Sequence, residues 1–140
     1  MNAKALLDTN IIICLFDSTD RLKQNKAERL VFGGLENGDA CISQQVLHES
    51  LNVFVRKLNF TFDDAQRVLN DILLPLCIPI PPASLYNRAL VINSRFKYGF
   101  YDSLVIASAV ELGCRQVFTE DLQNGQTLET VTIVNPFLAE

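Results

Sequence analysis

Residues 5–10, Ala5-Leu6-Leu7-Asp8-Thr9-Asn10, decide the fold of this chain. The first three are apolar, with no alternation of apolar and polar positions, which is typical of a short strand buried on both faces. The next three are polar and suited to capping a helix, and Ile11 to Phe16 continues into that helix. The stretch therefore predicts a buried strand that ends in polar side chains and passes directly into a helix.

Strands and helices alternate along the rest of the chain. Further strands are predicted at 40–42, 76–80, 115–119 and 131–134, and further helices at 21–37, 43–58, 61–74, 84–96 and 102–112. This order predicts a single α/β domain over residues 1–140. Its fold class is a three-layer sandwich, in which helices flank a central, mainly parallel sheet of about five strands. In such a sheet, ligands bind beyond the carboxyl ends of the strands, where the strand order reverses.

Helical periodicity assigns a buried face to two of these helices. In the helix at 21–37, which Gly33-Gly34 weakens, the residues expected to face inward are Leu22, Leu30, Val31 and Leu35. In the helix at 43–58, they are Leu47, Leu51, Phe54, Val55 and Leu58, opposite a polar stripe of Gln45, Glu49, Asn52 and Arg56. Periodicity alone does not decide whether this stripe faces solvent or lines a crevice.

Composition and charge exclude several classes of function. The chain of 140 residues carries a net charge of −4 and has a pI of about 4.9, unlike a protein that reads DNA sequence through a basic surface. No apolar run approaches the ~20 residues of a membrane span, and no signal peptide is visible, so we expect a cytoplasmic protein. The cysteines form no Cys-x-x-Cys pair and are expected to be reduced and buried; they are Cys14, Cys41, Cys77 and Cys114.

Acidic side chains follow two predicted strands and begin one predicted helix. Asp8 follows the first strand, and Asp121 follows the strand at 115–119. Asp102 begins a helix that is apolar nearly all round, where the positive end of the helix dipole favours an ionised carboxylate. Each acid also has a local explanation, since Asp8 and Asp102 are suited to capping and Asp121 to a turn. Carboxylates at strand ends nevertheless suit a site for a hard divalent cation.

Other kinds of catalytic site lack the residues that they need. His48 is the only histidine and is expected to be partly exposed. Neither a histidine-based zinc site nor a Ser-His-Asp triad is therefore supported. No glycine-rich phosphate-binding motif follows a predicted strand, so a nucleotide cofactor is unsupported as well.

Four segments of the chain resemble the motifs of the PIN domain family, in the family's order and spacing. They are residues 6–10 (Leu-Leu-Asp-Thr-Asn), 42–49 (Ile-Ser-Gln-Gln-Val-Leu-His-Glu), 100–107 (Phe-Tyr-Asp-Ser-Leu-Val-Ile-Ala) and 119–125 (Thr-Glu-Asp-Leu-Gln-Asn-Gly). The ending Ile133-Val134-Asn135-Pro136-Phe137 is similar to the family's last strand. The resemblance runs from Leu6 to Phe137, almost the whole chain.

This resemblance implies a nuclease that depends on magnesium or manganese. It implies that the catalytic and metal-binding residues are Asp8, Glu49, Asp102 and Asp121, with Asp121 preferred over the adjacent Glu120. The residues implied beside them are Thr9, Asn10, Ser103 and Thr119, of which Ser103 stands where alanine is common in the family. Single-domain members are mostly VapC-type toxins, which implies an RNA substrate, an antitoxin partner and a homodimer.

The chemistry expected of such a site is hydrolysis of RNA phosphodiester bonds. A divalent cation held by the carboxylates would make a water more acidic and stabilise the charge on the phosphate. Candidates for holding the RNA are Arg56, Lys57, Arg95, Lys97, Phe96, Tyr98 and Tyr101. Two other functions stay open. One is a metal-dependent phosphatase of the Asp-x-Asp type, although such an enzyme needs a second acid two positions after Asp8, where this chain has Asn10. The other is a binding module without turnover.

Overall fold

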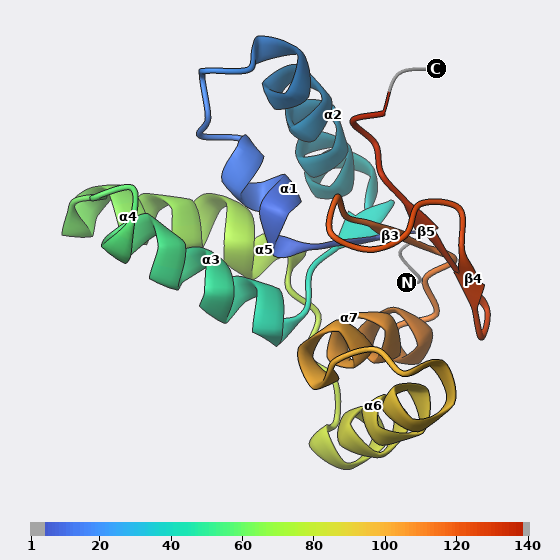
Figure 1. Cartoon of the computed structure of the whole chain (residues 1–140). Helices are drawn as coiled ribbons and strands as arrows, with labels where there is room; N and C mark the ends of the chain where they lie inside the picture. Colours follow the sequence, from blue (N-terminus) through green and yellow to red (C-terminus); the bar gives the residue numbers. More distant parts are fainter. Residues whose placement is uncertain (1–4, 139–140) are drawn as a thin grey trace.

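A sheet of five strands forms the middle layer of the computed structural model, which describes residues 5–138 (Figure 1). The strands are β1 (Ala5–Leu7), β2 (Ala40–Cys41), β3 (Gln116–Phe118), β4 (Thr127–Leu128) and β5 (Val131–Val134). β1 pairs in parallel with β2 and with β3, and β3 pairs in parallel with β5. β4, at the edge, runs antiparallel to β5. The predicted mainly parallel sheet is confirmed.

The order of the strands, β2-β1-β3-β5-β4, reverses at β1. The chain first places β2 on one side of β1 and much later places β3 on the other side. In parallel α/β sheets, such a reversal opens a crevice beyond the carboxyl ends of the two central strands. The residues that follow β1 and β3 are therefore the ones that the fold directs toward a ligand.

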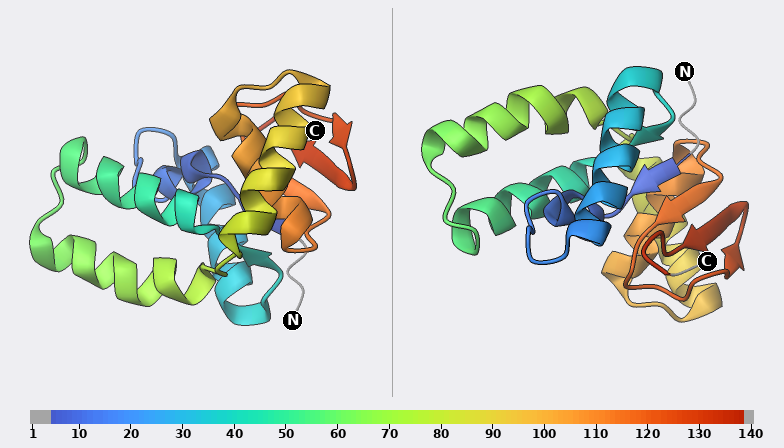
Figure 2. Two further views of the ribbon diagram at one scale, coloured as in Figure 1. Left: turned by 90° about the horizontal axis from the view of Figure 1, so that it is seen from below. Right: turned by 90° about the horizontal axis from the view of Figure 1, so that it is seen from above.

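Helices cover both faces of the sheet (Figures 1 and 2). They are α1 (Thr9–Cys14), α2 (Arg21–Asn37), α3 (Gln44–Arg56), α4 (Phe62–Val68), α5 (Leu74–Leu76), α6 (Pro82–Phe96) and α7 (Phe100–Glu111), with a π-helical segment (Leu69–Leu73) joining α4 to α5. Alternation along β1 divides the core into two clusters. Leu6 packs with α6 and α7, whereas Leu7 packs with α1, α2 and α3. The predicted three layers are therefore confirmed.

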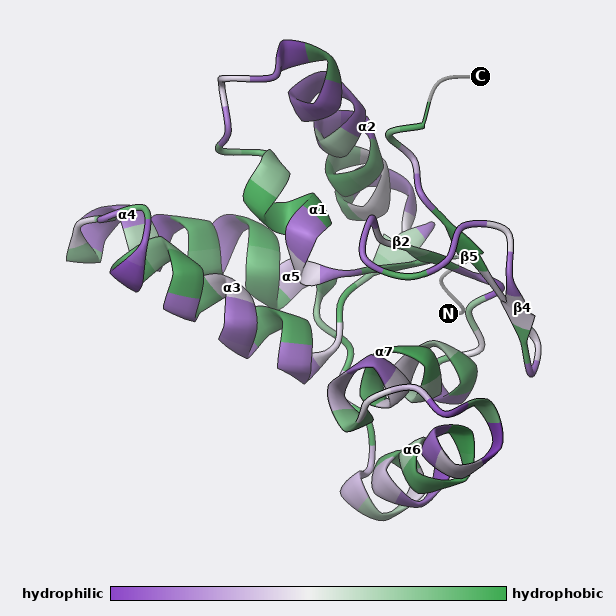
Figure 3. Ribbon diagram, viewed as in Figure 1, coloured by the Kyte–Doolittle hydropathy of each residue, from purple (hydrophilic) through white to green (hydrophobic). Residues whose placement is uncertain are grey.

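The hydropathy of the helices follows this layering (Figure 3). α7 contacts both α6 and the sheet, and its residues from Ser103 to Ala109 are all buried. A helix packed on two sides needs apolar residues all round, as the sequence of α7 predicts. Within residues 5–138, no helix is both long enough and apolar enough to cross a membrane.

The strand predicted at 76–80 is wrong, and proline explains why. The segment joins the sheet only through a bridge between Ile42 and Cys77, where the N–H of Ile78 donates to the carbonyl of Ile42 (3.0 Å). The next residue, Pro79, has no N–H to extend such a ladder, and prolines are rarely tolerated inside a sheet. The apolar character of the segment therefore serves packing and not strand pairing.

The fifth strand is instead β4, which the sequence does not indicate. The register places Leu128 opposite Val131, so that residues 129–130 form the turn between β4 and β5. Glu129 there has a φ of 54°, a conformation that glycine, asparagine or aspartate usually adopts in tight hairpins. Because a glutamate stands at this position, the turn carries none of the usual sequence signals.

The predicted helix faces are wrong where helices extend past the sheet. Leu22, at the start of α2, is 77% exposed, and Val55 and Leu58, at the end of α3, are 57% and 37% exposed. These helix ends project away from the sheet in Figure 1, so the sheet does not cover them. The fully buried positions are Ala27, Val31 and Gly34 in α2, and Val46, Ser50 and Phe54 in α3.

Gly34 allows α2 to approach β2 closely. A Cβ atom at Gly34 would lie 2.9 Å from the carbonyl oxygen of Ala40 and 3.0 Å from Cδ2 of Leu76, closer than a carbon atom is tolerated. At the neighbouring Gly33, the nearest atom would be a carboxylate oxygen of Asp39, at an ordinary 3.4 Å. The two glycines that weaken the helix in the sequence thus differ, and close packing requires only Gly34.

We predict that Gly34→Ala and Gly33→Ala change stability in opposite directions. Gly33→Ala should raise the free energy of unfolding by about 0.5–1 kcal/mol, because alanine favours the helix. Gly34→Ala should lower it by about 1 kcal/mol or more, because overpacking outweighs that gain. Urea denaturation of both variants measures the difference. Equal stabilisation by both substitutions would contradict the close approach of α2 to β2.

Candidate active site

A pocket of about 650 Å³ opens beyond the carboxyl ends of β1 and β3, where the strand order reverses. α1, the first turns of α2 and α7, one face of α3 and the loop after β3 form its walls. Its polar lining consists of Asp8, Thr9, Asn10, Asp17, Lys23, Gln45, Glu49, Asn52, Lys57, Tyr101, Asp102, Glu120 and Asp121. All four acids expected at the site therefore face one pocket.

Asp8 lies at the base of this pocket and is only 8% exposed. It is the N-cap of α1, where its Oδ1 accepts a hydrogen bond from the backbone N–H of Thr9 (2.8 Å). Its Oδ2 accepts a second hydrogen bond from Oγ1 of Thr119, which follows β3 (2.8 Å). The sequence left open whether Asp8 caps a helix or contributes to a site. In the structure, the same side chain caps α1 and lines the pocket.

Thr9 and Asn10 connect Asp8 to the other acids. Oγ1 of Thr9 donates to Oε1 of Glu49 in α3 (2.6 Å). Nδ2 of Asn10 donates to Oδ2 of Asp121 (3.0 Å) and approaches Oγ1 of Thr119 (3.2 Å). Two residues at the start of α1 therefore orient carboxylates that come from α3 and from the loop after β3.

Asp102 lies in the first turn of α7, but it does not cap the helix. The N-cap is Gly99, which has no side chain to accept a hydrogen bond. Asp102 accepts no hydrogen bond from any residue within 5–138, and it lines the pocket. The capping explanation for Asp102 is therefore wrong, and its carboxylate is free to bind a ligand near the positive end of the helix dipole.

Negative charge accumulates in the pocket and changes its proton affinity. Burial raises the pKa of Asp8 to about 6, and the nearby charges of Glu49 and Asp121 add to this rise. The hydrogen bonds from Thr9 and Thr119 oppose the rise, because they stabilise the ionised form. The pKa of Asp102 is raised by burial and then by the charges of Asp121 and Glu49. The acids thus repel one another and favour a cation between them.

The donor chemistry of the pocket fits a hard divalent cation. Carboxylate oxygens are the ligands that magnesium and manganese prefer, and the four acids supply them. Among residues 5–138, the lining includes no histidine, and burial raises the pKa of its one cysteine, Cys14, which keeps the sulfur protonated as a thiol. Within the part of the chain that the structure describes, however, no three Asp, Glu, His or Cys side chains converge closely enough to enclose an ion. The residues therefore fit a divalent cation in ligand type and charge, but their carboxylates lie too far apart in this structure to enclose one.

Most of the polar stripe of α3 lines the pocket, although Asn52 is also exposed to solvent. Gln45, Glu49 and Asn52 all line it, whereas Arg56 does not. Oε1 of Gln45 is buried and has no hydrogen-bond partner among the described residues. The question that periodicity left open is therefore settled for three of the four stripe residues.

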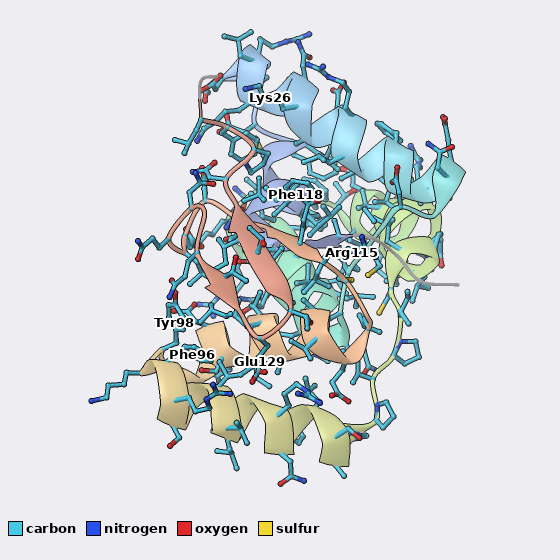
Figure 4. All side chains as sticks on the ribbon, turned by 90° about the vertical axis from the view of Figure 1, so that its right-hand side faces the viewer. Lys26, Phe96, Tyr98, Arg115, Phe118 and Glu129 are labelled. Atoms are coloured by element: carbon cyan, nitrogen blue, oxygen red, sulfur yellow. The ribbon has the colours of Figure 1, made fainter. Side chains whose placement is uncertain are left out.

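The other residues expected near the site divide between the pocket and elsewhere. Ser103 is fully buried in the core side of α7, and its Oγ has no hydrogen-bond partner among residues 5–138. Lys57 and Tyr101 line the pocket. Arg95 instead pairs with Glu129 of the β4–β5 turn, at 3.4 Å. Figure 4 shows Phe96 and Tyr98 at the end of α6 and Glu129 in the turn between β4 and β5. Arg56, Arg95, Lys97, Phe96 and Tyr98 lie outside the pocket lining.

Lys23 and Glu120 are pocket residues whose pairing the sequence does not reveal. Nζ of Lys23, in α2, lies 2.8 Å from Oε2 of Glu120, in the loop after β3. Asp121, the next residue, is held instead by Asn10. The adjacent acids thus have different partners: Glu120 pairs with Lys23 at the edge of the pocket, whereas Asp121 is held by Asn10 among the other acids. No local motif signals Lys23, because its partner lies 97 positions away.

Three solved structures share this fold at 20% sequence identity. A chain of a toxin-antitoxin complex from Klebsiella pneumoniae has a TM-score of 0.70, over 95% of this chain and 98% of that chain. A chain of FitAcB from Neisseria gonorrhoeae has a TM-score of 0.65 over the same shares. VapC20 of Mycobacterium tuberculosis, described as a toxin that cleaves the sarcin-ricin loop, has a TM-score of 0.61 over 84% and 91%. Curated proteins give no match in sequence.

At this level of identity, the structural likeness shows the fold alone. The sequence itself matches the family model of the PIN domain over residues 5–124. That span begins with β1 and ends after the acidic loop that follows β3, so it contains the four acids of the pocket. The chain therefore belongs to the PIN domain family.

Proposed function

We propose that this protein is an endoribonuclease that depends on Mg²⁺ or Mn²⁺, with Asp8, Glu49, Asp102 and Asp121 as its catalytic and metal-binding residues. The observation that carries the proposal is that four separate segments of the chain direct these carboxylates into one pocket at the switch point of the sheet. Membership of the PIN domain family supports it. The fold shared with VapC20, a toxin that cleaves the sarcin-ricin loop, supports RNA as the substrate.

In this proposal, the protein's own residues set the positions of the acids. Thr9 and Thr119 hold the two oxygens of Asp8, and Asn10 holds Asp121. Asp102 is left without a hydrogen-bond partner among the described residues and supplies the least constrained carboxylate. The metal, when bound, supplies the positive charge that makes a water more acidic and offsets the charge on the reacting phosphate. Either Glu49 or Asp121 then orients the attacking water.

We further propose that the protein is a cytoplasmic toxin that an antitoxin restrains. Two of the solved structures with this fold are a toxin-antitoxin complex and FitAcB. An arginine of an antitoxin would suit the pocket, because a guanidinium forms paired hydrogen bonds with carboxylates. A homodimer is proposed as well. The exposed apolar residues at the end of α3 and on α4 give it a surface to bury; they are Val55, Leu58 and Phe62.

We predict metal-dependent cleavage of single-stranded RNA that Asp102→Asn removes. The wild-type protein should cut a mixed-sequence RNA with Mg²⁺ or Mn²⁺ and not with EDTA. Asp102→Asn should reduce the rate by at least about 100-fold, because it removes a charged ligand from the site. Asp63→Asn, which removes an exposed acid of α4, serves as the matched control.

Gel separation of the RNA products measures the rates. Equal cutting by the wild type and Asp102→Asn would mean that a contaminating nuclease is responsible. Hydrolysis of p-nitrophenyl phosphate without cutting of RNA would favour the phosphatase. Binding of Mg²⁺ with neither reaction would favour a binding module.

We predict that the metal-free protein loses stability as the pH rises. The pKa of Asp8 is about 6 in the fold, against 3.8 for an ordinary aspartate, so the fold disfavours its ionised form. The cost is absent below pH 3.8 and complete above about pH 6, where it is about 2–3 kcal/mol. Asp8→Asn should flatten this part of the profile while keeping the helix cap, because asparagine caps equally well.

Urea denaturation between pH 4 and pH 8, with EDTA or with Mg²⁺, tests this prediction. Added Mg²⁺ should restore stability above pH 6 in the wild type, because a ligand that binds only the folded state stabilises it. Identical pH profiles for the wild type and Asp8→Asn would show that the carboxylate of Asp8 carries no such cost.

We predict that expression of the wild-type protein arrests bacterial growth. Asp8→Asn should restore growth at an equal protein level, because it removes a charged ligand and keeps the fold. Growth curves after induction, with immunoblots for the amount of protein, measure the effect. Unimpaired growth with an RNA-cleaving wild-type protein would separate the nuclease from the toxin role and reject the latter.

A further inference from the structure

The pocket proposed to bind RNA is strongly negative, which is a problem for a polyanionic substrate. Six carboxylates line it, two of them, Asp17 and Glu120, in addition to the four proposed metal ligands. Against these, the lining contains two cations, Lys23 and Lys57. Nucleic-acid binding depends mainly on cationic groups that neutralise backbone phosphates. Any phosphate that enters the pocket must therefore be received by these two lysines or by the bound metal.

Lys23 is held at the edge of the pocket by residues from two other segments. Its Nζ lies 2.8 Å from Oε2 of Glu120, in the loop after β3. The same atom lies 5.0 Å from the centre of the Phe137 ring, near the end of the chain. The side chains of Lys23 and Glu120 remain 39% and 33% exposed, so an incoming group can reach the ion pair from solvent.

We propose that Lys23 binds a backbone phosphate of the RNA at the mouth of the pocket, and that Glu120 occupies Lys23 until the RNA arrives. This inference rests on the proposed function. In this exchange, a phosphate oxygen takes the place of the Glu120 carboxylate beside the ammonium of Lys23. Lys23 therefore has a negatively charged partner both before and after the RNA binds. The ring of Phe137, 5.0 Å from the same ammonium, continues to attract Lys23 during the exchange.

The partners of Glu120 and Asp121 agree with this division of roles. Asn10 holds Asp121 on the side of the metal-binding acids, whereas Lys23 draws Glu120 toward the edge of the pocket. A purely structural role for the ion pair would contribute little, because ion pairs between exposed side chains add little to stability. The pair also joins α2 to the loop after β3, at the edge of the pocket.

Lys57 provides the second contact of the same path. It directly follows α3, while Lys23 lies in the first turn of α2, and Figure 1 shows α1 between α2 and α3. Both lysines line the same pocket as Asp8 and Asn10, at the start of α1. A single strand that contacts both lysines would therefore enter the pocket that the acids line, with Tyr101 available for stacking on a base.

Two substitutions that break the same ion pair distinguish the roles. Binding is measured by fluorescence anisotropy with a labelled single-stranded RNA and Mg²⁺, in the Asp102→Asn background, over a series of KCl concentrations. Lys23→Gln should weaken binding about three- to tenfold and lower the salt slope by about 0.7, the value for one phosphate contact. Glu120→Gln should tighten binding, because Lys23 is released. Lys26→Gln and Glu28→Gln, in the same helix, are the charge-matched controls.

A double variant shows whether Glu120 acts through Lys23. If it does, Glu120→Gln should no longer tighten binding when Lys23→Gln is already present. The proposal is overturned if Lys23→Gln behaves like Lys26→Gln, or if Lys23→Gln and Glu120→Gln both weaken binding, as the loss of a structural ion pair would. The anisotropy assay measures RNA binding and does not require cleavage. If the wild-type protein binds RNA but never cuts it, the proposed nuclease activity is rejected, while the comparison of these variants still tests the role of Lys23.

Discussion

The arrangement of this protein depends on how the carboxylate of Asp8 is held between a strand and a helix. The residue directly follows β1, caps α1 and accepts a hydrogen bond from Thr119 after β3. Burying an ionised carboxylate is unfavourable, and the two hydrogen bonds offset only part of that cost, as the pKa of about 6 shows. Because one group joins β1, α1 and β3, the geometry of the switch point and the chemistry of the pocket are coupled.

The same coupling sets stability against the proposed activity. An apolar residue at position 8 would remove the cost of burial, but it would also remove the charge that a divalent cation requires. The other acids add to the cost. The negative charges of Glu49 and Asp121 raise the pKa of Asp8 and also the pKa of Asp102. Thr9 and Asn10 keep these charges oriented and do not neutralise them. The pocket therefore contains carboxylates whose burial and mutual repulsion are unfavourable, within a fold that is otherwise well packed.

The fold could be predicted wherever local chemistry decides the structure. The apolar run of β1, the cap at Asp8 and the apolar α7 were all visible, and the structure bears them out. Two predictions about strands were wrong, one because of a proline inside the segment and one because of the backbone conformation of a single residue. Pro79 ended an apparent strand, and Glu129 adopted a turn conformation without the usual residue.

By itself, the sequence determined that acids follow β1 and β3 and that a polar stripe runs along α3. It also carried the four motifs that identify the family. Only the tertiary structure decided that this stripe faces the pocket, that Asp102 is not a cap, and that Lys23 holds Glu120 while Asn10 holds Asp121. The physical reason is range. Periodicity gives the direction of a side chain around its own helix, whereas the last two contacts join residues 97 and 111 positions apart, which meet only because the packed layers bring them together.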